Sequence, residues 1–278
     1  MVGVIEFDVP VDGVRLHAYD TGGDGAPIVW HHGTPNLGAP PEPLFAAADR
    51  LGLRWVSYDR PGYGGSTPAP GRDFASAAHY TAAVAGHLGL GRYAVFGHSG
   101  GGPHALACAA LLPDRVFAAV SVSGLAPIDA DGLDWFAGMA PASEATLRAS
   151  AAGRTARERH EATAEKDGDI GFADVDWAAL EGEWGWFGSV VGPAIAAGPA
   201  AQIDDDLANA GPWGFDPATI TVPVLLHHGE RDRMVPSTHS AWLAGRIPGA
   251  RFQRWPDDGH VSVLRHAGGA LDWLASYL

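Results

Sequence analysis

The feature that most constrains the fold is a serine bracketed by glycines, placed between a strand-like run and a helix-like run. Residues 97–101 read Gly-His-Ser-Gly-Gly; the apolar run 93–96 precedes them, and a helical pattern over 103–112 follows. A chain that turns sharply from a strand into a helix crowds its own backbone, so small residues must flank Ser99. The sequence therefore predicts a nucleophilic serine on a strained turn.

Short apolar runs of strand length alternate with helical patterns along most of the chain. The runs lie at 14–19, 27–31, 53–58, 93–96, 116–122, 223–228 and 251–255, and the helical patterns at about 76–90, 103–112 and 267–278. Strands separated by helices form a mostly parallel sheet that is covered on both faces. We therefore predict an α/β fold.

The strand pattern stops between about residues 131 and 216. A polar helical stretch covers 143–167, and five aromatic residues follow, at Trp177, Trp184, Trp186, Phe187 and Trp213. We predict that residues 1–130 and 217–278 form the core, and that residues 131–216 form an inserted, mainly helical cap.

A serine hydroxyl is a weak nucleophile, so it needs a base that is itself oriented by an acid. Among the 13 histidines, His260 is the best candidate because it follows the last expected strand in a polar turn; His266 is the fallback. Asp232 follows the strand-like run 223–228 and is the preferred acid, which gives the chain order Ser99, Asp232, His260. The competing acids are Asp129, Glu230, Asp257 and Asp258.

The segment after the second apolar run is the expected source of an oxyanion hole. Residues 32–35 read His-Gly-Thr-Pro, and proline has no N–H to donate. We therefore assign the two donors to the backbone N–H groups of Thr34 and Gly100. Each such group can stabilise a developing oxyanion by ~3 kcal/mol.

The amino-acid composition restricts the kinds of molecule that the protein is expected to bind. The formal charge of -14 argues against nucleic acid or an anionic membrane as a partner, and no run reaches the ~20 apolar residues of a membrane-spanning helix. A single cysteine, Cys108, and an N-terminus without a basic start and apolar run favour the cytoplasm. We expect a small-molecule substrate with little charge, and a homodimer is left open.

Two histidine pairs, His31-His32 and His227-His228, raise the question of a metal. Each pair lies in a strand-like run. Adjacent residues of a strand point to opposite faces, so neither pair is expected to share an ion. We predict no metal site.

Taken together, these residues resemble the α/β-hydrolase superfamily over roughly 14–129 and 220–278. Residues 58–66, Tyr-Asp-Arg-Pro-Gly-Tyr-Gly-Gly-Ser, look like the D-x-P-G-x-G-x-S loop of capped members such as esterases, epoxide hydrolases and C-C bond hydrolases. The resemblance implies an eight-stranded, mostly parallel sheet, a helical lid after the sixth strand, and no organic cofactor.

Departures from particular branches restrict the reaction. Epoxide hydrolases and haloalkane dehalogenases are similar but carry an aspartate where this chain has Ser99, so both activities are disfavoured. Proline iminopeptidases resemble the chain but carry H-G-G-P-G and a tryptophan after the serine, where residues 32–36 are His-Gly-Thr-Pro-Asn and position 100 is glycine. An aminopeptidase would also need acids in the cap, for which Glu181, Glu183 and residues 204–206 are candidates.

The sequence therefore predicts a serine hydrolase that cleaves a small ester or related acyl compound through an acyl-enzyme on Ser99. Trp184, Trp186 and Trp213 are predicted to line the substrate pocket, with Trp135 as a further candidate; the other reading is that these rings only join cap to core. A proline-iminopeptidase-like aminopeptidase and a non-hydrolytic ligand receptor are the alternatives.

Overall fold

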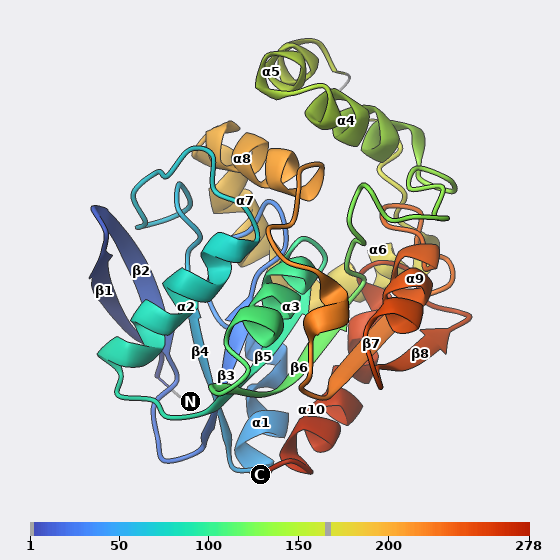
Figure 1. The fold of residues 1–278 in the computed structure, drawn as a ribbon. Helices are drawn as coiled ribbons and strands as arrows, with labels where there is room; N and C mark the ends of the chain where they lie inside the picture. The colour runs from blue at the N-terminus through green and yellow to red at the C-terminus, as the bar shows by residue number, and fades with distance from the viewer. Residues whose placement is uncertain (1–2, 165–167) are drawn as a thin grey trace.

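The strand-like runs form a single eight-stranded sheet (Figure 1). The computed structural model describes residues 3–164 and 168–278, and the strand order is β1-β2-β4-β3-β5-β6-β7-β8. The strands are β1 (Ile5–Val11), β2 (Val14–Asp20), β3 (Ala26–His31), β4 (Leu53–Tyr58), β5 (Tyr93–His98), β6 (Val116–Val122), β7 (Val224–Gly229) and β8 (Arg251–Trp255). Strand β2 is antiparallel to both neighbours, whereas β4, β3 and β5 to β8 are parallel, so the prediction of a mostly parallel sheet is confirmed.

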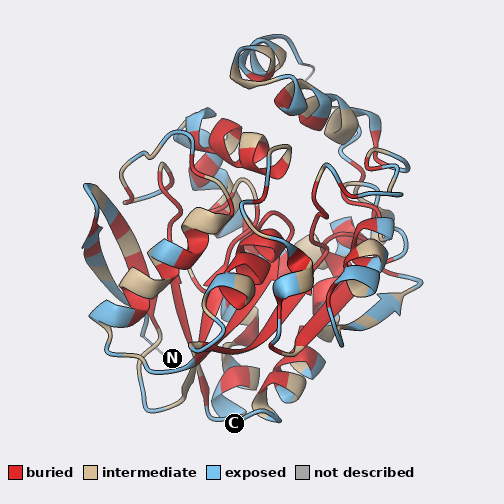
Figure 2. Cartoon of the chain, in the orientation of Figure 1, coloured by how far each residue is buried: buried red, intermediate tan, exposed pale blue. Residues whose placement is uncertain are grey.

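Helices cover both faces of the sheet, and the central strands are correspondingly apolar. Helices α2 (Ala75–His87), α3 (Gly101–Leu111) and α9 (Thr238–Arg246) lie on one face, and α1 (Phe45–Arg50) and α10 (Ala267–Ala275) on the other (Figure 1). Every residue of β5, β6 and β7 is buried (Figure 2). Continuous burial of this kind is typical of parallel strands covered on both sides, and it explains why their runs lack alternation.

Five α-helices lie between β6 and β7, where the sequence predicts a helical cap. They are α4 (Pro141–Ala151), α5 (Arg154–Thr163), α6 (Asp174–Glu181), α7 (Phe187–Ala196) and α8 (Ala200–Asn209), with a short 3-10 helix at Glu183–Trp186. We call residues 131–216 the helical segment. The polar helical stretch predicted over 143–167 contains two helices, since the chain turns at Gly153, which has a φ of 99°. Residues 165–167 lie outside the described residues.

Strand β1 is an element that the sequence analysis missed. It pairs with β2 along its full length through a tight turn at Asp12 and Gly13, which both have positive φ. Only Val9 and Val11 of this edge strand are buried, so its apolar pattern is weak. The Asp-Gly pair between two alternating runs is a hairpin signal that could have revealed it. In the part of the chain that the structure describes, no helix is long and apolar enough to cross a membrane.

The turn at Ser99 has the close packing that the glycine pattern predicts. Ser99 has a φ of 55°, in the left-handed region that residues other than glycine seldom adopt. A Cβ on Gly97 would collide with the carbonyl of Gly101, and a Cβ on Gly101 would collide with the carbonyl of His31. Both positions therefore require glycine for the strand, the turn and the helix to pack.

We predict that Gly101→Ala lowers the free energy of unfolding by about 2–3 kcal/mol, because the new methyl group meets backbone that cannot move aside. The matched control is Gly86→Ala in the exposed part of α2, where a Cβ meets nothing within 4 Å. This change should instead stabilise the protein by about 0.5–1 kcal/mol, since alanine favours a helix. Urea unfolding of both variants measures the two shifts, and shifts of the same sign would contradict the packing argument.

Candidate active site

The predicted nucleophile lies in a cavity of about 730 Å³ between the sheet and the helical segment. Ser99 and Gly100 line it from the end of β5, and Thr34 lines it from the loop after β3. The opposite walls come from α4, α5 and α8, which lie above the sheet in Figure 1. Residues from distant parts of the sequence thus meet at the carboxyl end of parallel strands, where such sheets gather their ligands.

The structure also brings Asp232 and His260 together. Asp232 Oδ2 lies 2.7 Å from His260 Nδ1, and both side chains are buried. The other carboxylate oxygen accepts the N–H groups of Met234 and Val235, each at 2.9 Å. The turn after β7 therefore fixes the acid, and the acid fixes one edge of the imidazole.

Charge complementarity sets the protonation of this pair. Burial raises the pKa of Asp232, but His260 and His228 outweigh it and hold the pKa below its usual range. Burial lowers the pKa of His260, but the Asp232 carboxylate outweighs it, so the pKa of His260 lies above 6.5. His98 next to Ser99 is different: burial and the nearby His260 lower its pKa to about 3, and it stays neutral.

The backbone around His260 is held from two sides. From the core, His98 Nε2 donates to the carbonyl of His260 at 2.9 Å. From α6, the carboxylate of Asp176 accepts the N–H groups of His260 at 3.2 Å, Val261 at 2.9 Å and Ser262 at 2.8 Å. Sequence analysis missed Asp176, because it lies 84 residues before His260 in a segment without a recognised motif.

The groups predicted to contact a substrate make no hydrogen bond to the described residues. Ser99 Oγ and His260 Nε2 make no hydrogen bond there, and neither do the backbone N–H groups of Thr34 and Gly100. Thr34 packs directly on Gly100, since its Oγ1 lies 2.7 Å from the position of a Cβ on that glycine. The two predicted oxyanion donors are therefore adjacent and free.

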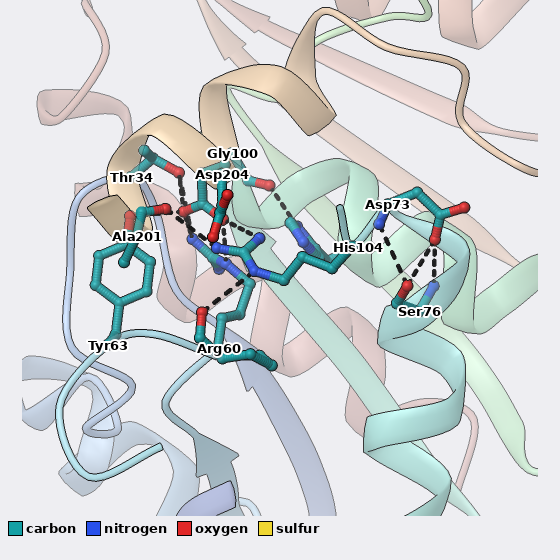
Figure 3. A network of polar contacts seen from close by, with 12 residues as sticks. Thr34, Arg60, Tyr63, Asp73, Ser76, Gly100, His104, Ala201 and Asp204 are labelled. Carbon is teal, nitrogen blue, oxygen red and sulfur yellow. Dashed lines mark hydrogen bonds and ion pairs between the residues drawn. The ribbon is translucent and has the colours of Figure 1, made fainter. Parts of the chain in front are cut away.

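A fully buried carboxylate from α8, that of Asp205, holds the loop that carries Thr34. Figure 3 labels three of its binding partners, Thr34, Arg60 and Tyr63. Asp205 is 1% exposed, and its oxygens accept from Thr34 Oγ1 at 2.7 Å and Tyr63 at 2.9 Å. They also bind the guanidinium groups of Arg60, with Nε at 3.0 Å, and Arg72, with Nη1 at 2.5 Å. Burial raises the pKa of Asp205, but the two arginines outweigh it and hold the pKa well below its usual range.

Arg60 connects this carboxylate to the backbone of the same loop. Its guanidinium donates to the carbonyls of His32 and Gly33, and its backbone N–H donates to His32 Nε2 at 3.1 Å. His32 Nδ1 in turn donates to the carbonyl of Gly33 at 2.8 Å. Burial and the neighbouring Arg60 hold the pKa of His32 well below 6.5, so this histidine is a neutral structural link.

The three tryptophans predicted to bind substrate do not line this cavity. Trp184 and Trp213 are 2% and 3% exposed and pack in the hydrophobic cores on opposite faces of the sheet. Trp186 is partly buried against the same core as Trp184. Their positions fit the alternative interpretation of the sequence, in which these rings join the helical segment to the core.

Most of the competing candidates lie outside the cavity. Asp258 pairs with His266 at 2.9 Å, and Glu230 pairs with Arg254 at the surface. Glu181 and Glu183 are exposed; of the acids at 204–206, only Asp206 lines the cavity. In the described ranges 3–164 and 168–278, no group of three or more His, Cys, Asp or Glu residues is arranged to hold a metal ion.

We predict that Asp205→Asn lowers the free energy of unfolding by about 3–5 kcal/mol, because it leaves two buried guanidinium groups without their counter-ion. The control is Glu144→Gln, which breaks the exposed pair with Arg148 on α4. Such a pair contributes about 0.3–0.5 kcal/mol. Unfolding both variants in urea gives the comparison, and similar midpoints would show that Asp205 does not organise the loop.

Comparison with known proteins agrees with this geometry. The family described as alpha/beta hydrolase fold matches residues 26–267. A non-heme haloperoxidase of Rhodococcus erythropolis is 29% identical over 91% of this chain and 92% of its own length. A non-heme chloroperoxidase of Streptomyces lividans is 32% identical over 83% of each chain.

Solved structures show the same fold. A thermophilic esterase from Thermogutta terrifontis aligns with a TM-score of 0.70 at 23% identity, covering 98% of this chain and 99% of its own. A bromoperoxidase from Bacillus anthracis aligns with a TM-score of 0.71 at 20% identity, with the same coverage. The family match, the sheet order and the serine at the strand-to-helix turn agree, and the chain belongs to the α/β hydrolase fold family of hydrolases.

Proposed function

We propose that the protein is a serine hydrolase that cleaves a small ester or related acyl compound. The observation that carries the proposal is the serine at a φ of 55°, in a cavity where the N–H groups of Thr34 and Gly100 have no partner among the described residues. The buried Asp232–His260 pair lies against His98, the neighbour of Ser99. A nucleophile, an oriented base and an oxyanion site are the parts that acyl transfer needs.

In the proposed reaction, Ser99 Oγ attacks the acyl carbonyl while His260 Nε2 takes the hydroxyl proton. Asp232 accepts the Nδ1–H of His260, which keeps the free lone pair on Nε2 and stabilises the imidazolium. The N–H groups of Thr34 and Gly100 stabilise the negative oxygen of the tetrahedral intermediate. His260 then gives its proton to the leaving alkoxide, and an acyl-enzyme remains on Ser99.

Water completes the cycle by the same groups. His260 removes a proton from water, the resulting hydroxide attacks the acyl-enzyme, and the carboxylic acid leaves as Ser99 recovers its proton. These steps need no organic cofactor and no metal.

We further propose that the helical segment acts as a cap over the cavity, and that the enzyme works in the cytoplasm on a small, weakly charged substrate rather than on nucleic acid or a membrane.

A haloperoxidase activity is the second candidate. The non-heme chloroperoxidase of Streptomyces lividans shares 32% identity over 83% of this chain. Bromination of monochlorodimedone in hydrogen peroxide and bromide separates this activity from ester hydrolysis. Comparing the two assays on one preparation shows which reaction the site favours.

We predict that the protein hydrolyses p-nitrophenyl acetate and butyrate with steady turnover, and that Ser99→Ala lowers kcat by about 10⁴-fold or more, because the variant has no nucleophile. Release of nitrophenol measures the rate, and circular dichroism checks that both proteins are folded. Equal rates in a folded Ser99→Ala protein would remove this serine from the chemistry. A single burst without turnover would support a ligand receptor instead.

The raised pKa of His260 predicts the pH dependence. The base must be neutral to accept a proton, so kcat/KM should be low in acid and rise through a midpoint above pH 6.5. Asp232→Asn removes the charge that raises this pKa, so the midpoint should move to lower pH while the rate falls by about 10⁴-fold.

The rate at which a fluorophosphonate labels Ser99 between pH 5 and 9 measures both the shifted midpoint and the lower rate, even in the slow Asp232→Asn variant. His98 stays neutral throughout, since its pKa is about 3. A midpoint that stays in place in Asp232→Asn would show that this carboxylate does not set the protonation of the base.

A further inference from the structure

One face of α8 forms a polar wall of the cavity. Gln202, Asp206 and Asn209 all line it, and their spacing of four and three residues places them along a single side of the helix. At 1.5 Å per residue, this row extends for about 10 Å. Asn209 lies at the end of the row that approaches Gly100.

Parts of the other walls are apolar, although α5 adds Arg157, His160 and Glu161 to the lining. Leu125, Leu147, Met234 and Val235 line the cavity, and they come from the core and from α4. The cavity therefore offers an apolar surface together with a row of hydrogen-bonding groups. A plain alkyl chain would satisfy the first and leave the second without partners.

Asn209 is the residue of this row that approaches Gly100, next to the predicted nucleophile Ser99. It is 5% exposed, and its side-chain amide makes no hydrogen bond to any described residue. Its Oδ1 lies 3.7 Å from the position of a Cβ on Gly100, the proposed oxyanion donor. The amide lines the cavity and is not among the fully buried polar atoms, so a ligand that enters the cavity can bind it.

Asp206 also belongs to the polar wall, and its carboxylate is paired with the guanidinium of Arg157. Its Oδ2 accepts from Arg157 Nε at 2.9 Å, and Arg157 Nη1 also donates to Glu161 at 2.8 Å. Burial raises the pKa of Asp206 to about 7, although Arg157 opposes the shift. Near neutral pH Arg157 balances one of the two carboxylates and Asp206 is about half ionised, so the cluster carries a small negative charge that disfavours a carboxylate on the substrate.

We propose that the preferred substrate is an ester whose acyl group carries a hydroxyl or oxo oxygen close to the scissile carbonyl, and that the Asn209 amide binds this oxygen. The inference rests on the proposed esterase function and deepens it. The short distance from Asn209 to Gly100 places the bound oxygen within one or two carbons of the carbonyl. The oxygen at the third carbon of an acyl chain meets this condition.

The test compares two p-nitrophenyl esters, the butyrate and the 3-hydroxybutyrate, each corrected for its rate of hydrolysis by hydroxide. We expect the wild type to favour the 3-hydroxybutyrate by about fivefold to tenfold in kcat/KM, the effect of one hydrogen bond. Asn209→Leu should bring this ratio close to one. Asn209→Ala serves as a second variant in case the leucine prevents folding.

The matched control is Gln253→Leu, which removes an exposed amide from β8, away from the cavity, and should keep the wild-type ratio. A wild type without preference, or an Asn209→Leu protein that keeps it, would overturn the inference while leaving the esterase proposal intact. If Asn209→Leu lowers kcat/KM equally for both esters, the amide binds the carbonyl oxygen instead, and the inference is overturned as well. No turnover of either ester would remove the esterase proposal itself.

Discussion

The buried carboxylate of Asp205 is the interaction on which the site depends. It comes from α8, yet its partners are Arg60, Arg72, Tyr63 and Thr34, all from the core. A carboxylate that is 1% exposed is tolerable only because two guanidinium groups balance its charge and two hydroxyl groups complete its hydrogen bonds. The position of the loop 32–34 therefore depends on a residue that lies outside the sheet and is distant in sequence.

Asp176 has the same role at the other end of the site. It lies on α6 and accepts three consecutive backbone N–H groups that begin at His260. The helical segment thus supplies one carboxylate beside the proposed base and one beside the proposed oxyanion donors. Besides lining the pocket, the helical segment therefore holds the backbone that carries the groups on its floor.

The parts of the structure that could be predicted from sequence are those governed by short-range rules. Seven strands follow from apolar runs, and Ser99 follows from glycines whose neighbours leave no room for a Cβ. Asp232 and His260 could be placed because turns after parallel strands share one edge of the sheet. Asp176, Asp205 and Asn209 could not be placed, since their roles depend on how helices without motifs dock. The sequence predicts the tryptophans in the pocket and the structure packs them in the core, because apolar rings suit a core and a binding site equally well.

The two anchoring carboxylates divide the helical segment into parts with different freedom to change. Helices α6 and α8 must keep their registers, since a shift of one residue would remove Asp176 or Asp205 from its partners. The α4–α5 hairpin, residues 141–163, lines the cavity but supplies neither carboxylate. Apart from Arg157, whose guanidinium pairs with Asp206 of α8, sequence drift in that hairpin can therefore reshape the pocket without disturbing the proposed chemistry. This makes the hairpin the natural region to randomise when the scaffold is evolved toward new substrates.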